Sequence, residues 1–370
     1  CGTLEIDATF LLRRLLTELD RLQDGSAYHR DQLNRLLDPR AVREAPDLPP
    51  PVPARLNAEQ RRAGRRALAC RTAFIFGPPG TGKTATLAVL VASHLRLGRR
   101  VLVMAASNQA LDTLVAAILA QPHGLDPDAA VRLGDPDPRI LGSQADRLLP
   151  EAIAERAGRS VESVVRQARL VAATPYQAYL RGERIGRIEA AVLDEASMMP
   201  LPVALLAAAM AESWCAVAGD PRQLPVVALA QGPDIQAGYR RDLFEVTGVA
   251  DALLAGADIP SAVQLRAQYR MDERICRLIN SRFYAGTLRS PRGRRGSPLG
   301  WSEAVCRIDT AALEGRCVAA GERGSRFNPV SAAVAAGAAR RLERRGISVG
   351  VVTPYSAQAD LISAMLRDRG

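Results

Sequence analysis

The segment GPPGTGKT at 77–84 limits the folds open to this chain more than any other. An apolar run, TAFIF at 72–76, precedes it, and the helical stretch TATLAVLVASHLRL follows. Closely spaced glycines let a backbone turn tightly between a strand and a helix. Strand, glycine-rich turn and helix in this order predict an α/β fold.

The same segment has the chemistry of a phosphate-binding loop, because it matches the pattern G-x-x-x-x-G-K-[ST]. Backbone N–H groups around its glycines can surround phosphate oxygens without interference from a Cβ, and the following helix adds a partial positive charge. Lys83 would reach the β- and γ-phosphates, and the Thr84 hydroxyl would bind Mg²⁺. We therefore expect Mg-ATP to contact the whole loop: Gly77, Pro78, Pro79, Gly80, Thr81, Gly82, Lys83 and Thr84.

Lys83 is the only lysine in a chain with 49 lysines and arginines. The arginine guanidinium is planar and bulky, whereas the lysine ammonium is compact enough for a narrow phosphate cradle. The position of the single lysine therefore supports the phosphate-binding interpretation.

Composition narrows the class of protein. A length of 370 residues accommodates two domains, and 48% hydrophobic with 24% charged residues is ordinary for a soluble globular protein. The net charge of +10 permits a polyanionic partner such as nucleic acid. Six scattered cysteines and three histidines lack zinc-site spacing, so we expect a reduced, cytoplasmic protein without a membrane span. The first residue is Cys, which suggests an internal fragment of a longer protein.

The chain divides into three parts. Residues 1–54 combine an amphipathic helical segment, whose leucines lie three or four residues apart, with a proline-rich hinge. Residues 55–258 alternate apolar strands and helices, which predicts a parallel sheet covered on both faces, with a mostly helical insert at 121–169. Residues 259–370 form a partial second domain. Strands are expected at 72–76, 101–106, 170–173, 190–193 and 215–218, and in the second domain at 262–266, 304–308 and 348–353.

A pair of carboxylates follows one of these strands, in the letters AAVLDEAS. Asp194 ends the strand and would hold Mg²⁺ opposite Thr84, while Glu195 would orient or deprotonate the attacking water. The alternative is a helix-capping Asp beside a solvated Glu. In VAGDPRQLPVV at 217–227, Gln223 could reach the γ-phosphate; the alternative there is a proline-rich loop with Asp220 as turn former.

Several motifs occur in a characteristic order along the chain. They are LNAEQ (56–60), the phosphate-binding loop, VLVMAASNQALDTL (101–114), AATPYQA (172–178), DEAS (194–197), GDPRQLP (219–225), LRAQYRM (265–271) and VGVVTPYSAQADLI (349–362). This order resembles the superfamily 1 helicases, and within them the Upf-like group of the B subfamily, which moves 5′ to 3′. The resemblance covers residues 56–362.

The resemblance implies two RecA-like domains with doubly wound parallel sheets, the second incomplete. By it, Gln60 would read the adenine edge, Tyr269 would stack on the base, and Arg270 would be an arginine finger across the cleft. A single nucleic-acid strand would contact residues that follow strands of the two sheets: Ser107, Asn108, Thr174, Pro175, Thr353, Pro354 and Tyr355. The alternative for Arg270 is an ordinary solvated arginine. The alternative for the residues at the strand ends is that they are plain helix caps or turns.

The family pattern continues past the T-P-Y motif with a Q-G-x-E signature and a second arginine finger, and neither follows here. We therefore expect residues 1–370 alone to hydrolyse ATP poorly and not to unwind duplexes, and further domains or subunits to complete the second domain. Two other functions stay open: a P-loop ATPase that remodels a protein complex, and a nucleotide-dependent scaffold in a repair or defence assembly.

Overall fold

The computed structural model describes residues 8–25, 28–41, 56–227, 232–233, 235–293, 304–321 and 324–367. The chain divides into two compact units, Cys1–Gly293 and Arg294–Gly370. The expected proline-rich hinge lies outside the described residues.

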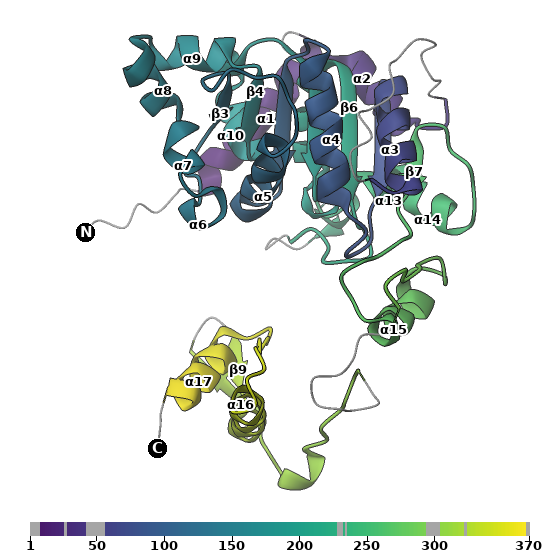
Figure 1. Ribbon diagram of the computed structural model, residues 1–370, viewed down its shortest axis with the longest axis vertical. Helices are drawn as coiled ribbons and strands as arrows, with labels where there is room; N and C mark the ends of the chain where they lie inside the picture. The colour runs from purple at the N-terminus through teal and green to yellow at the C-terminus, as the bar shows by residue number, and fades with distance from the viewer. Residues whose placement is uncertain are drawn as a thin grey trace. The chain divides into compact units, whose positions relative to one another are not determined.

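The first unit is organised around a seven-stranded sheet in the order β3-β4-β2-β5-β6-β1-β7 (Figure 1). All neighbouring strands in this sheet are parallel. The strands are β1 (Thr72–Phe76), β2 (Val101–Ala105), β3 (Ala130–Arg132), β4 (Leu170–Ala173), β5 (Ile188–Asp194), β6 (Ala211–Gly219) and β7 (Ala262–Gln264). The five strands expected between 72 and 218 are all present, which confirms the doubly wound α/β fold.

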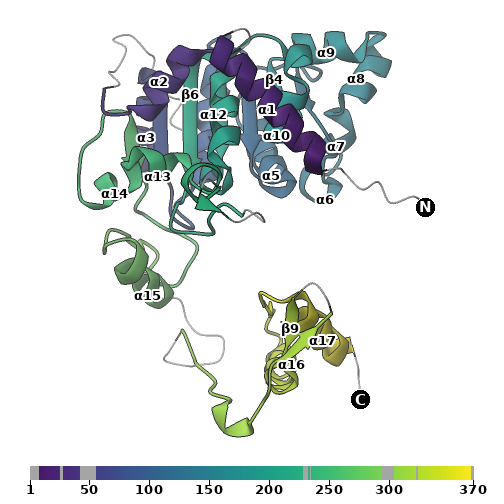
Figure 2. The ribbon, with the colours of Figure 1, turned by 180° about the vertical axis from the view of Figure 1, so that it is seen from behind.

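Helices cover both faces of this sheet, because β1 and β2 are buried along their whole length and need apolar cover on each side. Helices α3 (Ala58–Ala69), α4 (Lys83–Arg96) and α5 (Asn108–Leu119) cover one face (Figure 1). The other face is covered by α1 (Ala8–Asp24), α2 (Arg30–Leu37), α10 (Pro175–Leu180) and α12 (Leu201–Ala209) (Figure 2). The first unit also contains α11 (Gly182–Ile185), α13 (Leu243–Thr247), α14 (Val249–Leu254), α15 (Glu273–Phe283), a 3₁₀ turn (Ala196–Met198) and a π turn (Ile235–Tyr239).

The amphipathic helix expected near the N-terminus is α1, but its buried stripe is narrower than the leucine pattern suggests. Leu15 and Leu22 pack against α10 and α12, whereas Leu16 is 61% exposed. A helix that lies on a flat layer buries only one side, so leucines on adjacent turns can face outward.

The insert at 121–169 is helical as expected, and it also adds an edge strand to the sheet. Its helices are α6 (Pro138–Leu141), α7 (Gln144–Arg147), α8 (Pro150–Ala157) and α9 (Val161–Gln167). Strand β3 pairs in parallel with β4. The insert is therefore an integral part of the first unit.

The strand expected at 262–266 belongs to the first sheet and not to a second domain. As β7 it pairs with β1, from Phe74 opposite Ala262 to Phe76 opposite Gln264. The first compact unit continues to Gly293, past the boundary expected at 259. The sheet that this segment joins is decided by strand pairing, because an apolar segment pairs with a sheet edge that offers free backbone N–H and C=O groups.

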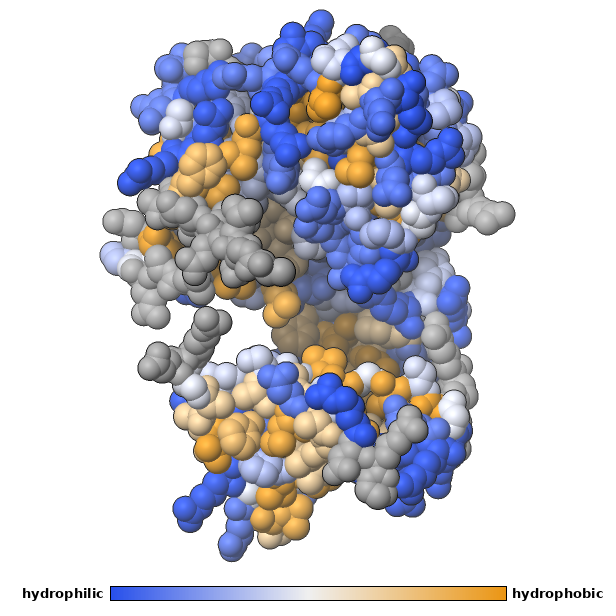
Figure 3. Space-filling model, turned by 90° about the vertical axis from the view of Figure 1, so that its left-hand side faces the viewer, coloured by the Kyte–Doolittle hydropathy of each residue, from blue (hydrophilic) through white to orange (hydrophobic). Residues whose placement is uncertain are grey.

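The second unit does not form the two strands expected at 304–308 and 348–353. Its described part contains a 3₁₀ turn (Ala311–Leu313), an antiparallel pair of β8 (Val318–Ala320) and β9 (Ser325–Phe327), and helices α16 (Pro329–Glu343) and α17 (Ser356–Arg367). Val352 is 95% exposed and hydrophobic side chains gather on the visible surface of this unit (lower part of Figure 3). A parallel strand requires neighbouring strands to satisfy its backbone groups, and within the described residues 304–308 and 348–353 have none.

None of the described helices is long and apolar enough to cross a membrane. The five cysteines in the described ranges are all free thiols.

Candidate ATP-binding site

The phosphate-binding loop connects β1 to α4 at the carboxyl edge of the sheet. Gly80 and Gly82 have φ values of +75° and +81°, a region that favours glycine. The Thr81 hydroxyl donates to the Pro78 carbonyl at 2.7 Å, which closes the turn. Lys83 is the first residue of α4, so the loop delivers its side chain at the helix N-terminus.

Lys83 connects the loop to both carboxylates predicted from the sequence. Its Nζ lies 2.8 Å from Oε1 of Glu195 and 3.6 Å from Oδ1 of Asp194. Strand β6 lies between β5 and β1, so this contact spans the end of an intervening strand. The structure therefore brings Lys83 together with two adjacent carboxylates that lie more than a hundred positions away in the sequence.

The two carboxylates differ in environment. Asp194 is the last residue of β5 and is buried; burial raises the pKa of its carboxyl, and the charge of Lys83 offsets this only in part. Glu195 is half-exposed and has φ +52°, the left-handed region that costs a non-glycine residue about 1–3 kcal/mol. Strain of this kind concentrates at functional sites.

The residues present fit a magnesium ion. Mg²⁺ is usually held by one or two carboxylates together with substrate phosphates. The buried Asp194 carboxylate and the Thr84 hydroxyl on the first turn of α4 are hard oxygen donors of that kind. These two residues would hold the ion.

Asp220, interpreted from the sequence as a possible turn former, connects three parts of the site. It follows β6 and is fully buried. Its Oδ2 accepts from the Gln223 amide and from the Tyr284 hydroxyl, each at 2.8 Å. Burial raises the pKa of the Asp220 carboxyl, and the hydrogen bonds from Gln223 and Tyr284 oppose that shift. Tyr284 lies in the letters RFYAGTL, which match none of the motifs above, so sequence analysis missed it.

Gln60 is held against the phosphate-binding loop. It closes a capping box with Asn57 at the start of α3, and its amide donates to the Thr81 carbonyl at 2.9 Å. A Cβ on Gly82 would meet this amide nitrogen at 2.2 Å, so the close approach requires glycine. The Tyr269 hydroxyl accepts from the Asn57 side chain at 3.0 Å, which brings both predicted base-contact residues to one edge of the loop.

Arg270 lies on the loop within the first unit, whereas the sequence suggested a second domain across a cleft. The backbone N–H of Tyr269 donates to the Gly80 carbonyl at 2.8 Å. A Cβ on Gly80 would lie 2.5 Å from the Cβ of Arg270. The difference arises because β7 returns the chain to the first sheet immediately before this segment.

Two of the predicted nucleic-acid contacts start helices at the same sheet edge. Ser107 caps α5 after β2, and Thr174 caps α10 after β4, with Pro175 at its first position. Strands β2 and β4 are neighbours, so these caps lie on adjacent strand ends. Asn108 accepts a hydrogen bond from Arg132 at 2.9 Å.

Arg132 is a supporting residue that sequence analysis missed. It lies at the end of β3 in the insert and forms an ion pair with Asp112 at 2.7 Å, with both side chains fully buried. A lone arginine in an arginine-rich chain carries no local signal of burial. Only the pairing of β3 with β4 shows where it lies.

The remaining predicted contacts, Thr353, Pro354 and Tyr355, belong to the second unit. They precede α17, where the Tyr355 carbonyl accepts from the backbone N–H of Ala359 at 3.1 Å. The preceding segment is not a strand, so they do not follow a strand as expected.

A glycine-rich loop between a parallel strand and a helix, with its lysine beside an Asp-Glu pair on a nearby strand end, defines a P-loop nucleotide-binding protein with a RecA-like doubly wound sheet. Two family models, each described as an AAA domain, match residues 55–153 and 249–370.

Several curated relatives are named as helicases. The chain is 29% identical over 268 residues to "DNA replication ATP-dependent helicase/nuclease dna2" of Schizosaccharomyces pombe, covering 72% of the chain and 18% of that protein. It is 29% identical to "RNA helicase Mov10l1" of Mus musculus (85% and 28%) and 25% identical to "ATP-dependent helicase NAM7" of Saccharomyces cerevisiae (86% and 35%). The chain thus spans between about a sixth and a third of these relatives. Over most of its length the chain is therefore similar to proteins that are named as helicases.

Proposed function

We propose that this chain is the motor core, or part of the motor core, of an ATP-dependent helicase or translocase that moves 5′ to 3′ along single-stranded nucleic acid. The observation that carries the proposal is the convergence of Lys83, Asp194 and Glu195 at the phosphate-binding loop. A lysine for phosphates, a carboxylate for a metal and a second carboxylate for water are the groups that ATP hydrolysis requires.

Each group has a distinct part in the proposed reaction. Lys83 binds the β- and γ-phosphates, and Glu195 orients the attacking water and accepts its proton. Thr84 and Asp194 hold Mg²⁺, which when bound neutralises charge on the phosphate oxygens. Gln223 contacts the γ-phosphate. Arg270 is the candidate arginine finger, and its backbone already packs on the loop.

The proposed base site lies at the start of α3. Gln60 reads the adenine edge and Tyr269 stacks on the base. The hydrogen bond between Asn57 and the Tyr269 hydroxyl supports this assignment, because it holds the two candidates on one side of the loop.

The proposed nucleic-acid track begins at the helix caps after β2 and β4. Ser107, Asn108 and Thr174 are short polar residues suited to phosphate contacts, which carry little sequence information. In the second unit, Thr353 and Tyr355 are proposed as further nucleic-acid contacts. The net charge of +10 agrees with a polyanionic partner. The names of the relatives include both DNA and RNA helicases, so either nucleic acid is a candidate.

The first test is steady-state ATP hydrolysis by the chain with and without single-stranded DNA or RNA. We expect stimulation by one of them that falls steeply as salt rises from 50 to 200 mM, on the order of the 10³–10⁵-fold affinity loss typical of several phosphate contacts. ATP turnover that ignores both nucleic acids would favour a protein-remodelling ATPase instead. Nucleotide binding without turnover would favour a scaffold.

Direction needs a separate measurement. Displacement of streptavidin from biotin at either end of a single strand reports which way a translocase moves. Because residues 1–370 alone are expected to hydrolyse ATP poorly, we expect slow ATP-dependent displacement at the 3′ end and none at the 5′ end. The reverse result would contradict the proposed polarity while leaving the ATPase assignment in place.

A further inference from the structure

Tyr284 directly follows the C-terminal residue of α15 and contacts the ATP-binding site. Its hydroxyl donates to Oδ2 of Asp220 at 2.8 Å, and the Gln223 amide donates to the same oxygen at 2.8 Å. Tyr284 is buried and Gln223 is exposed. A buried tyrosine and an exposed glutamine therefore share one carboxylate oxygen.

Hydrogen bonds hold both the side chain and the backbone of Asp220 in place. Its other oxygen, Oδ1, accepts from the backbone N–H of Arg222 at 3.0 Å. Its own backbone N–H donates to the hydroxyl of Ser197 at 3.1 Å. Ser197 stands two residues after Glu195, so Asp220 connects the water-activating segment to the Gln223 loop.

The turn that follows α15 holds Tyr284 in place. Ala285 has φ +50°, the left-handed region that is strained for alanine, and Gly286 follows at +74°. Asn280 closes the turn with two hydrogen bonds to the backbone of Leu288, at 2.9 and 3.0 Å. The Tyr284 ring also packs against Phe76, the last residue of β1, with centroids 6.3 Å apart. A strained, doubly bonded turn specifies the tyrosine position much more tightly than packing alone would.

The bonding pattern also fixes the Gln223 amide. A carboxylate only accepts hydrogen bonds, so the amide must present its NH₂ group to Asp220. The carbonyl oxygen and the second amide hydrogen then stay available to an incoming γ-phosphate and its attacking water. Without the tether, the exposed side chain would sample several rotamers.

We propose that Tyr284 is a positioning residue for the ATP-binding site: its hydroxyl fixes the Asp220 carboxylate, and this carboxylate holds Gln223 in the orientation that the γ-phosphate requires. The inference rests on the proposed ATP hydrolysis at this site. It adds a residue outside the recognised motifs to that reaction.

The test is Tyr284→Phe, which keeps the ring against Phe76 and removes only the hydroxyl. We expect kcat for ATP to fall about ten- to a hundredfold, the effect of one hydrogen bond to a charged group, with KM for ATP unchanged within about twofold. In a Gln223→Ala background the same substitution should have no further effect on kcat, because Tyr284 acts through Gln223. A merely structural role would lower kcat equally in both backgrounds.

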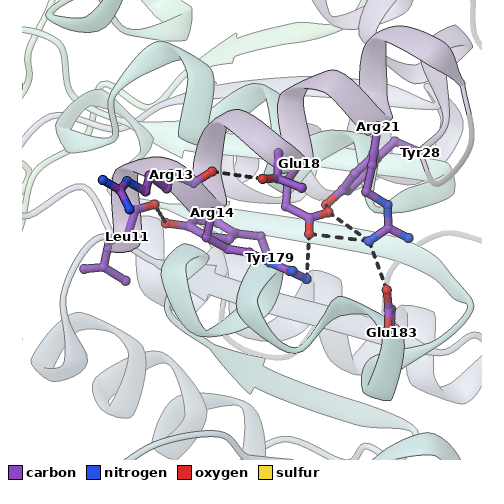
Figure 4. A network of polar contacts seen from close by, with 9 residues as sticks. Leu11, Arg13, Arg14, Glu18, Arg21, Tyr28, Tyr179 and Glu183 are labelled. Carbon is purple, nitrogen blue, oxygen red and sulfur yellow. Dashed lines mark hydrogen bonds and ion pairs between the residues drawn. The ribbon is translucent and has the colours of Figure 1, made fainter. Parts of the chain in front are cut away.

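Tyr28→Phe is the matched control. The Tyr28 hydroxyl donates to the buried Glu18 carboxylate at 2.7 Å, so it makes the same kind of bond as Tyr284 (Figure 4). This pair lines a cavity of about 280 Å³ beside Ile188, at the start of β5 and hence at the opposite edge of the sheet. We expect Tyr28→Phe to leave kcat unchanged, with melting temperatures measured for all variants.

The outcomes separate the two proposals. Normal turnover in Tyr284→Phe, or an equal fall in the Gln223→Ala background, overturns the role of Tyr284 and leaves the ATPase intact. A wild-type chain that neither binds nor hydrolyses ATP overturns the proposed function, and the role of Tyr284 with it.

Discussion

The ammonium nitrogen of Lys83 lies 2.8 Å from a carboxylate oxygen of Glu195, so the loop lysine and the candidate general base are bound to each other. A phosphate that binds Lys83 competes with Glu195 for the same charge. Phosphate binding and release of the base are therefore coupled through one ion pair. The coupling gives a physical reason for the two residues to act together.

Lys83→Arg should abolish ATP turnover and leave the fold intact. The planar guanidinium does not fit the space between the loop and Glu195 that the compact ammonium occupies. We expect kcat to fall on the order of 10²-fold or more, with an unchanged melting temperature. Arg96→Lys, an exposed exchange in the last turn of the same helix, is the control and should behave as wild type. Normal turnover in Lys83→Arg would refute the assigned role of the only lysine.

Glu195→Gln should separate ATP binding from hydrolysis. The amide keeps the size of the carboxylate but cannot accept a proton, and general-base catalysis contributes about 10²–10⁴-fold. We expect ATP affinity within a few-fold of wild type and kcat lower by that factor, measured by equilibrium binding and steady-state assay. Glu162→Gln, in an exposed ion pair on α9, is the control. If both variants turned over ATP at the wild-type rate, Glu195 would not be the base.

Arg132→Met should destabilise the first unit much more than Arg139→Met. Each arginine makes a 2.7 Å ion pair with an aspartate, but Arg132 and Asp112 are fully buried, whereas Arg139 is 89% exposed. Removal of one partner of a buried pair leaves an uncompensated charge and costs about 3–5 kcal/mol. An exposed pair contributes about 0–1 kcal/mol. Urea unfolding measures both, and equal losses would contradict the argument.

His94 should make the fold sensitive to acid. Burial, and then the charge of Arg99, lower the pKa of His94 to about 3, whereas histidine in an unfolded chain titrates near about 6.5. Between these values the unfolded chain binds a proton that the folded chain excludes. The free energy of unfolding therefore falls as pH drops below the unfolded pKa, by about 1.4 kcal/mol per pH unit.

His94→Gln is the variant that measures this effect, since glutamine can still accept from Arg99, which lies 2.9 Å from the His94 ring. Between pH 7 and pH 5, wild type should lose about 2 kcal/mol more of its unfolding free energy than the variant. Parallel pH profiles for the two proteins would show that His94 is protonated in the folded state.

The local pattern of the sequence predicted most of the first sheet. Runs such as 101–105 and 170–173 are apolar throughout, and a continuous apolar run between helices has few folds available besides a covered parallel strand. The expected strands at 304–308 and 348–353 are also rich in apolar residues, but they include polar ones, and they do not form because a strand also requires neighbouring strands. The apolar pattern of a segment shows which side chains it can bury. The segment becomes a strand only where a neighbouring strand pairs with it.

The sequence by itself determined the chemistry of the phosphate-binding loop, since Lys83, Thr84 and the glycines act within a few residues of one another and their spacing is their geometry. Only the tertiary structure decided which distant residues serve that loop. Asp220 and Tyr284 stand 64 positions apart, and Arg132 meets Asp112 through a strand of the insert. These pairs form where the sheet brings distant chain segments together. The residue type at one position does not identify the distant residue that it will contact.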